Sequence, residues 1–133
     1  MKAVKIFTIL ILVYVGMVIV FESLLGYYQP ENQSTLIITT TDEDGIEKNR
    51  VLARLESNGQ LYIAANHWPR AWYYQTLDNP NVQITFEGDT SDYLAVPVTG
   101  EEHERVNSDN RHSIVFRILV GFAPRYFFRL EPR

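Results

Sequence analysis

An apolar stretch near the start of the chain differs from everything that follows it. Residues 6–21 contain no charged side chain, Lys2 and Lys5 precede them, and Glu22 follows. A helix rises about 1.5 Å per residue and the hydrocarbon core of a bilayer is about 30 Å thick, so about 20 residues are needed to cross it. Residues 4–25 supply that length if Lys5 reaches the headgroups on one side and Glu22 lies at the other interface. The pattern predicts a single-pass transmembrane helix.

Two other interpretations of the apolar stretch stay open, a cleavable signal peptide and a helix packed on the domain. A signal peptide has a short apolar region followed by small residues at its cleavage site. Here the apolar run is long, and Glu22, Leu24 and Leu25 stand where small residues are needed. The membrane anchor is therefore favoured. We assign residues 1–28 to the anchor and its flank and residues 29–133 to a separate domain.

The basic flanks of the apolar stretch predict its orientation. Lys2, Lys5 and the α-amino group lie on one side, whereas the other side has no Lys or Arg before Lys48. The positive-inside rule then favours a cytoplasmic N-terminus and an exported domain. A cytoplasmic domain is the alternative.

The pattern of residues 29–133 is mainly that of β-strands. Val82, Ile84 and Phe86 alternate with polar residues, which is typical of a half-buried strand. Asn58-Gly59 is a dipeptide that favours a type I′ hairpin turn between two antiparallel strands. Six strands are predicted, at residues 34–41, 51–56, 61–65, 82–87, 93–98 and 125–130.

Two helical insertions interrupt these strands. One is a loop and short helix within residues 66–80, and the other begins at the capping-box pattern from Thr99 to Glu102. A second helix capped by Ser108 or Asp109 is expected to follow it and to end near Val120. A six-stranded antiparallel meander most economically closes into a small barrel. The predicted fold class is therefore mainly β with α insertions, a six-stranded antiparallel barrel preceded by one transmembrane helix.

Composition excludes several classes of function. The chain has no cysteine, which rules out disulfides, thiol catalysis and cysteine metal sites. Its formal net charge of -4 argues against a nucleic-acid partner, because such binding needs a clustered basic surface. The three histidines lack metal-site spacing, and the acidic residues 42–44 lack the later ligands of an EF-hand loop. No metal is expected.

One segment resembles a known family signature. Residues 72–82 are Trp-Tyr-Tyr-Gln-Thr-Leu-Asp-Asn-Pro-Asn-Val, which resembles the Trp-Tyr-x-Asn-Leu-x-x-Asn-Pro-x-Val signature of the deazaflavin-dependent nitroreductase family. The loop with Gly45, the Asn58-Gly59 hairpin and a closing strand from Arg125 follow the order of that family. The resemblance covers most of residues 34–132. It implies a split barrel of the pyridoxamine phosphate oxidase type that binds a flavin, with the deazaflavin F-420 or FMN as cofactor.

The resemblance also implies a cofactor site. Barrel amides together with Gly45, Lys48 and Arg50 would face the phosphate of the cofactor. The residues expected along its ring are Asn66, His67, Trp68, Trp72, Tyr73 and Gln75. The structural alternatives are that Trp72 and Tyr73 are core aromatics and that His67 is a solvated loop residue. No catalytic residue is assigned.

The chain departs from the family pattern at two places. Asp42-Glu43-Asp44 stands where cofactor-binding members carry a basic phosphate loop, so carboxylates there repel an anionic group. The substrate-side tyrosines of the family have no counterpart, because no tyrosine lies between Tyr93 and Tyr126. The resemblance therefore supports the fold more directly than the cofactor.

A third feature is an apolar stripe near the end of the chain. Its members recur at helical spacing with Arg111 and Arg117 beside them, and they are Ile114, Val115, Ile118, Leu119 and Phe122. One interpretation is a helix that plugs one side of the barrel. The other is a face that dips into the bilayer beside the anchor, with the arginines at the headgroups.

Together these features give two hypotheses for function. The first is a membrane-anchored flavin- or deazaflavin-dependent oxidoreductase of the nitroreductase or quinone reductase type, acting on a lipophilic acceptor. The second is a degenerate split barrel that serves as a ligand-binding or interaction module without catalytic activity. The expected partners are the lipid bilayer and a lipophilic small molecule. A homodimer stays open, since split barrels often pair at a shared cofactor face.

Overall fold

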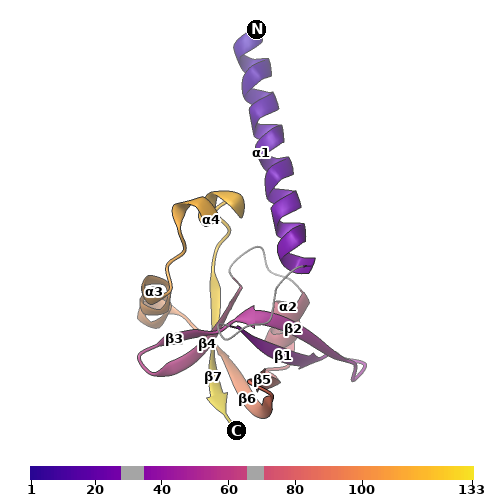
Figure 1. The fold of residues 1–133 in the computed structure, drawn as a ribbon, viewed down its shortest axis with the longest axis vertical. Coiled ribbons are helices and arrows are strands. Elements are labelled where there is room, and N and C mark those ends of the chain that lie inside the picture. Colours follow the sequence, from indigo (N-terminus) through magenta and orange to yellow (C-terminus); the bar gives the residue numbers. More distant parts are fainter. Residues whose placement is uncertain (28–34, 66–70) are drawn as a thin grey trace.

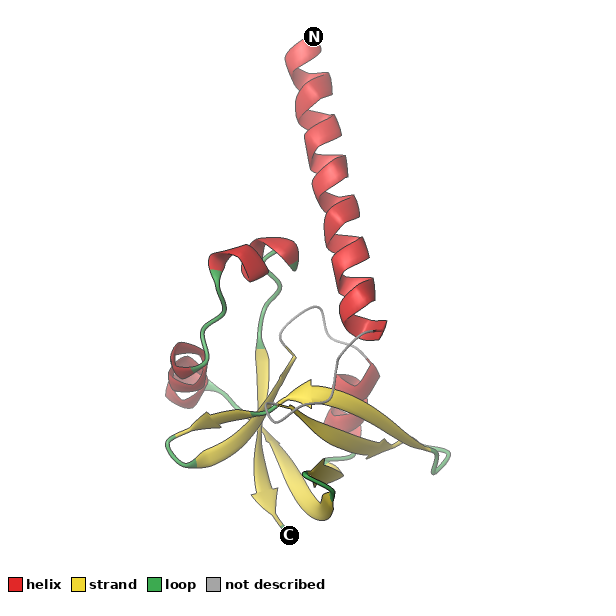
Figure 2. Cartoon of the chain, viewed as in Figure 1, coloured by secondary structure: helices red, strands yellow, loops and turns green. Residues whose placement is uncertain are grey.

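The computed structural model describes residues 1–27, 35–65 and 71–133. A long helix projects from a β-domain that carries three shorter helices, and the C-terminus lies at the end of the domain away from that long helix (Figures 1 and 2). The helices are α1 (Lys2–Tyr27), α2 (Ala71–Asp78), α3 (Gly100–Asp109) and α4 (Ile114–Leu119). The strands are β1 (Thr35–Thr41), β2 (Glu47–Ala53), β3 (Leu55–Ser57), β4 (Gln60–Ala65), β5 (Asn81–Phe86), β6 (Asp89–Pro97) and β7 (Tyr126–Pro132).

Helix α1 confirms that the apolar stretch is helical. Within the described residues, α1 is the one helix long and apolar enough to cross a membrane, over Lys2–Leu24, and its apolar side chains are largely exposed, whereas Glu22 near its end is buried. A side chain such as Leu12 is 64% exposed and meets no protein core. Such a helix fits a membrane span or a signal sequence.

The seven strands form one antiparallel sheet that curves into a half-barrel. Its strand order is β2-β1-β5-β6-β7-β4-β3. The mainly β architecture is as predicted, but the sheet has seven strands where six were expected. The extended segment predicted at residues 51–56 is broken at Arg54, because β2 pairs with β1 whereas β3 pairs with β4. The chain passes at Arg54 from one edge of the sheet to the other.

Two hairpin turns contain residues with positive φ. Asn58 and Gly59 have φ values of 52° and 76°, as the predicted type I′ turn requires. Glu87 and Gly88, between β5 and β6, have φ values of 52° and 84°. Strand β6 ends at Pro97, consistent with the missing proline N–H.

Helix α3 starts where it was predicted, whereas α4 starts later than predicted. Thr99 is the N-cap of α3, but its side chain makes no cap hydrogen bond, so the capping-box prediction is wrong in that respect. Glu102 instead accepts two hydrogen bonds from Arg129 Nη1, at 2.7 and 2.8 Å. The next helix begins after Ser113, whose hydroxyl accepts from the Phe116 amide, and not at Ser108 or Asp109. The reason is that α3 continues through Asp109.

The core has two parts. The larger lies inside the half-barrel and contains Ile38, Ile63, Ile84 and Phe128, with Trp72 of α2 packed against them. The smaller lies under α3 and is built from Tyr62, Ala64, Val98, Val106 and Phe127. Both faces of β4 and β7 are therefore covered, which places α2 and α3 on opposite sides of these strands (Figure 2).

Candidate functional site

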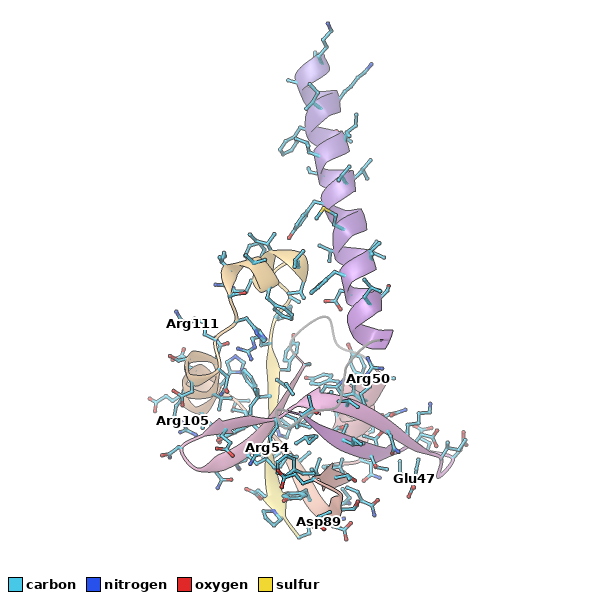
Figure 3. The ribbon with its side chains drawn as sticks, in the orientation of Figure 1. Glu47, Arg50, Arg54, Asp89, Arg105 and Arg111 are labelled. Atoms are coloured by element: carbon cyan, nitrogen blue, oxygen red, sulfur yellow. The ribbon has the colours of Figure 1, made fainter. Side chains whose placement is uncertain are left out.

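The β1–β2 hairpin and α2 form the first candidate site. Directly opposed residues of an antiparallel pair lie on the same face of the sheet. Thr40 pairs with Lys48 and Ile38 pairs with Arg50. Because Ile38 is fully buried and Thr40 is 2% exposed, Lys48 and Arg50 belong to the inner face, on which α2 packs. Figure 3 shows Arg50 on the side of the domain toward the end of α1.

Lys48 and Arg50 line a small pocket of about 130 Å³ between β2 and α2. Its lining residues are Thr40, Lys48, Asn49, Arg50, Ala71, Trp72 and Gln75. The Thr40 hydroxyl donates a hydrogen bond of 2.8 Å to Gln75 Oε1, which fixes the Gln75 side chain between the hairpin and α2. Four of the predicted site residues, Lys48, Arg50, Trp72 and Gln75, thus converge. Thr40 was missed, because its place opposite Lys48 and its contact with Gln75 depend on the hairpin register and on the packing of α2.

A larger hollow of about 660 Å³ adjoins this pocket and is acidic. Gln75 lines both of them, and the larger one is otherwise lined by Thr41, Asp42, Glu43, Asp44, Asp78 and Asn79. The hairpin loop bonds to itself. Asp42 Oδ1 accepts from the amides of Asp44 and Ile46, both at 2.9 Å, and the Asp42 carbonyl accepts from the Gly45 amide at 3.0 Å.

This bonding tests whether the loop fits a cofactor phosphate. A phosphate cradle needs backbone N–H groups that point outward to the ligand. The amides of residues 44–46 are already engaged by Asp42, and four carboxylates surround the hollow. The loop therefore does not fit an anion. Gly45 belongs to this loop and does not line the small pocket with Lys48 and Arg50. Lys48 and Arg50 fit a phosphate, because both are cations on the inner face.

The aromatic residues of the family signature pack as core residues. Trp72 is 6% exposed, and its ring lies 6.3 Å from that of Phe128. The Tyr73 ring lies 5.3 Å from Tyr126 and 5.4 Å from Phe128. Burial, with smaller effects of Tyr126 and Tyr74, raises the pKa of Tyr73. Trp72 also lines the small pocket, whereas Tyr73 does not. Asn66, His67 and Trp68 lie outside the described residues.

A second hollow lies between α3, α4 and the segment before β7. This α3–α4 cleft has a volume of about 390 Å³. Its lining residues are His103, Asn107, Arg111, His112, Phe116, Arg117, Val120, Phe122, Ala123 and Arg125. Three of them are arginines and none is a carboxylate. The sequence pattern singled out Arg111 and Arg117 beside the apolar stripe but missed Asn107, which joins them only because α3 and α4 fold toward each other.

Burial lowers the pKa values of two groups in the α3–α4 cleft, Arg125 and His112. Arg125 Nη1 donates to Asn107 Oδ1 at 2.9 Å and to the Asn110 carbonyl at 2.7 Å. Burial lowers the pKa of Arg125 to about 10, so it stays charged at pH 7. Burial, together with Arg125, lowers the pKa of His112 to about 4, so His112 is neutral there. The positive charge of the cleft therefore comes from its arginines.

Helix α4 contacts the long helix. The Tyr14 hydroxyl donates to the Ile118 carbonyl at 2.7 Å, and the rings of Phe21 and Phe116 meet edge to face at 5.8 Å. Figure 1 shows α4 beside the half of α1 nearest the domain. The side chains of Ile114, Val115 and Ile118 are exposed, so the helix does not plug the barrel.

Comparison with known proteins identifies the family. The model of the family described as F420H(2)-dependent quinone reductase matches residues 14–116. No curated protein sequence matches the chain significantly.

Solved structures share the fold. A protein described as a domain-swapped dimer has a TM-score of 0.61 at 20% identity, covering 83% of this chain and 92% of its own. An F420-H2 dependent reductase has a TM-score of 0.52 at 18% identity, covering 76% and 98%. An FMN-binding protein related to pyridoxamine 5'-phosphate oxidase, from Nostoc punctiforme, has a TM-score of 0.54 at 14% identity, covering 75% and 71%. These similarities show the split-barrel fold.

Proposed function

The chain belongs to the F420H(2)-dependent quinone reductase family, and we propose that it is a membrane-anchored oxidoreductase that uses a deazaflavin or flavin cofactor to reduce a lipophilic acceptor. The observation that carries this proposal is the family match over residues 14–116, which runs from α1 through α4. The acceptor class that we propose is a quinone or a nitro compound. Residues 1–28 are the anchor and residues 29–133 are the catalytic split barrel.

On the cofactor side, the pocket between β2 and α2 supports two roles. Lys48 and Arg50 bind the phosphate, because a cation on the inner face forms charge-assisted hydrogen bonds with it. Gln75, held by Thr40, and Trp72 border the ring. When bound, the cofactor supplies the hydride chemistry, and the protein binds and orients it. We keep Asn66, His67 and Trp68 on the ring side as part of the proposal, whereas Gly45 has no such support.

The acidic hollow bears on the choice of cofactor. Asp42, Glu43, Asp44 and Asp78 lie along the path that leads away from the small pocket past Gln75. An extended anionic tail on that path would meet like charges, and each such pair is unfavourable at short range. A cofactor whose anionic part stays near Lys48 and Arg50 fits better. FMN is therefore favoured over F-420.

The lipophilic acceptor is supported by the position of α1. A helix with an exposed apolar surface from Lys2 to Leu24 keeps the domain at a membrane, where quinones are dissolved. The face that carries Arg50 lies toward the end of that helix (Figure 3). An acceptor arriving from the bilayer therefore reaches the cofactor side without crossing the far end of the domain.

The second candidate function is a ligand-binding or interaction module without catalytic activity. The specific observation in its favour is the hairpin loop, whose amides bond to Asp42 and whose carboxylates exclude an anion. An exported domain, as Lys2 and Lys5 predict, favours it too, because the reduced cofactors of the family are normally cytoplasmic.

The deciding experiment titrates the full chain in lipid nanodiscs with FMN, F-420 and heme while absorbance and fluorescence are followed. We expect saturable binding of FMN or F-420 at micromolar concentration. K48Q and R50Q should each weaken it about tenfold or more, because each removes one charge-assisted contact. R133Q removes the same charge from an exposed position and should change nothing. Absence of saturable binding by FMN and F-420 would establish the non-catalytic module instead.

We also infer that two barrels pair as a homodimer. The support is the structural neighbour described as a domain-swapped dimer. Light scattering of the purified full chain in detergent, corrected for bound detergent, measures the number of copies, and a monomer at all concentrations contradicts this inference.

A further inference from the structure

Helix α4 carries an apolar face that no described part of the chain covers. The side chains of Ile114, Val115 and Ile118 are 57%, 63% and 42% exposed, and Phe122 just beyond the helix is 56% exposed. Scattered exposed apolar residues are ordinary, but a contiguous group rimmed by polar residues marks an interaction site. The apolar face of α4 is therefore an interaction site.

The contacts with α1 give the depth of this face in the membrane, measured along α1 from Glu22. Tyr14 and Phe21 of α1 contact α4, and Glu22 follows Phe21 directly. If Glu22 lies at the membrane interface, Tyr14 is eight residues deeper, or about 12 Å at 1.5 Å per residue. Amphipathic helices that lie in the interface bury their apolar face to about 5–10 Å. The Phe21 contact lies about 1.5 Å from Glu22 by the same rise, so the two contacts bracket this depth.

The hydrogen bond from Tyr14 is suited to an apolar environment. A hydroxyl in the hydrocarbon region needs a protein partner, since water is absent there. The Tyr14 hydroxyl has one in the Ile118 carbonyl at the last turn of α4, a carbonyl that also accepts from the Gly121 amide at 3.0 Å. The two helices thus join without leaving this group unsatisfied.

The charge beside the apolar face is positive. The α3–α4 cleft contains Arg111, Arg117 and Arg125 and no carboxylate, in a chain whose formal net charge is -4. The guanidinium of Arg117 lies 5.7 Å from the Phe122 ring centre, so a cation stands at the border of the apolar face. Long basic side chains at such a border reach the headgroups while their stems cover apolar surface.

We propose that α4 and the α3–α4 cleft bind the membrane that holds α1. The apolar face of α4 inserts among the acyl chains, and the arginines of the cleft bind the phosphate of an anionic lipid headgroup. The proposal rests on the anchoring part of the proposed function and is independent of any cofactor or reaction. Its consequence is a second point of attachment, which holds the half-barrel in one orientation against the bilayer.

The absence of native cysteine allows a direct test on the full chain. An environment-sensitive fluorophore is placed by I114C, by L12C within α1, or by D89C at the far end of the domain (Figure 3). Each labelled protein is reconstituted in nanodiscs that contain phosphatidylcholine, with or without phosphatidylglycerol, and lipids with doxyl-labelled acyl chains. We expect quenching at positions 12 and 114 and none at position 89.

The labelled positions separate the two proposals. Quenching at position 12 without quenching at position 114 overturns the docking of α4 and leaves the anchor intact. Quenching at neither position overturns the anchor and the docking together, whatever the cofactor titration shows. Because the label at position 114 could itself disturb the face, V115C serves as a second position, and both must be quenched.

The lipid charge is tested with single arginine variants. Phosphatidylglycerol should increase quenching at position 114, and R111Q and R117Q should each weaken the docking equilibrium about fivefold in those discs. The matched variant R133Q removes one exposed positive charge elsewhere and should leave quenching unchanged. Equal quenching with and without phosphatidylglycerol overturns the headgroup site. The same holds if inorganic phosphate, added to phosphatidylcholine discs, reproduces the whole effect.

Discussion

At the scale of single residues, Glu102 anchors α3 to the sheet. It accepts two hydrogen bonds from Arg129 Nη1 and one of 2.7 Å from the Tyr62 hydroxyl. The Arg129 contact, followed by smaller contributions from Tyr62 and Arg105, holds the pKa of Glu102 below its ordinary value. The carboxylate form is thus favoured by folding, although the position of Glu102 after Thr99 had suggested a cap.

We predict that E102Q lowers the free energy of unfolding by about 1–3 kcal/mol at pH 7, because it removes charge-assisted hydrogen bonds. The folded pKa is depressed, so the contribution is fully present above the ordinary value of 4.5 and is lost as the pH falls through the folded pKa. Denaturant unfolding of the detergent-solubilised full chain, at pH 7 and below pH 4, measures both effects. The difference between the two proteins should shrink in acid.

The control for this prediction is the ion pair between Arg54 and Glu56, which lie 2.6 Å apart. The Glu56 side chain is 59% exposed, and an exposed pair contributes little, about 0–1 kcal/mol. E56Q should therefore change stability less than E102Q does. If E56Q costs as much as E102Q, or if the cost of E102Q does not change with pH, the Glu102 network does not have the role described.

Single residues also show what the sequence could and could not predict about the site. The inner-face position of Lys48 and Arg50 follows from strand alternation once the hairpin register is known. The self-bonding of the loop at Asp42 could not be predicted, because it depends on backbone conformations that residues 42–46 adopt together. The same is true of Thr40, whose hydroxyl finds Gln75 only after α2 packs on the hairpin.

At the scale of elements, most strands were predictable and their breaks were not. Alternation at Val82, Ile84 and Phe86 and the Asn58-Gly59 turn gave their elements correctly. The change of partner at Arg54 could not be predicted, since a strand that leaves one edge of a sheet for the other carries no local signal. The start of α4 was placed too early because Ser108 and Asp109 are residue types typical of an N-cap, whereas α3 continues through Asp109 and Ser113 is the N-cap.

The β5–β6 hairpin yields a stability prediction. Glu87 has a positive φ of 52°, which is unfavourable for most side chains and better tolerated by asparagine. E87N should therefore raise the free energy of unfolding by about 0.5 kcal/mol. Asn58 occupies the equivalent position of the β3–β4 hairpin, so N58E should lower it by a similar amount.

Denaturant unfolding of the two variants under identical conditions is the measurement. Glu87 and Asn58 are both exposed, so a burial change does not enter the comparison. Changes of the same sign in the two variants would show that the effect comes from charge or from local contacts and not from the left-handed backbone.

At the scale of the whole molecule, the sequence predicted a split barrel and an apolar helix separately. The contact of α4 with Tyr14 and Phe21 could not be predicted, because it joins segments about 100 residues apart through two rings and one hydroxyl. That contact fixes where α4 lies along α1. If α1 spans the bilayer, the α3–α4 cleft and the face with Arg50 lie near its surface, and the C-terminus points away (Figure 1).

The last prediction concerns the side of the membrane on which the barrel lies. Lys2 and Lys5 flank α1 at its start, and no basic residue follows it before Lys48, so the positive-inside rule predicts an exported domain. An alkaline phosphatase fused after Arg133 should then be active and a green fluorescent protein fused there should be dark. The C-terminus suits such fusions, because it lies at the end of the domain remote from α1 (Figure 1).

A charge-inverted variant supplies the control. K2Q and K5Q combined with Q29K and Q33K move two positive charges from one flank of α1 to the other and should reverse both reporters. A cytoplasmic barrel in the native chain would contradict the prediction and would give it access to the reduced cofactors of its family. An exported barrel must instead receive electrons from a donor on that side. If the barrel is exported and also fails to bind FMN and F-420, the non-catalytic module is the better interpretation.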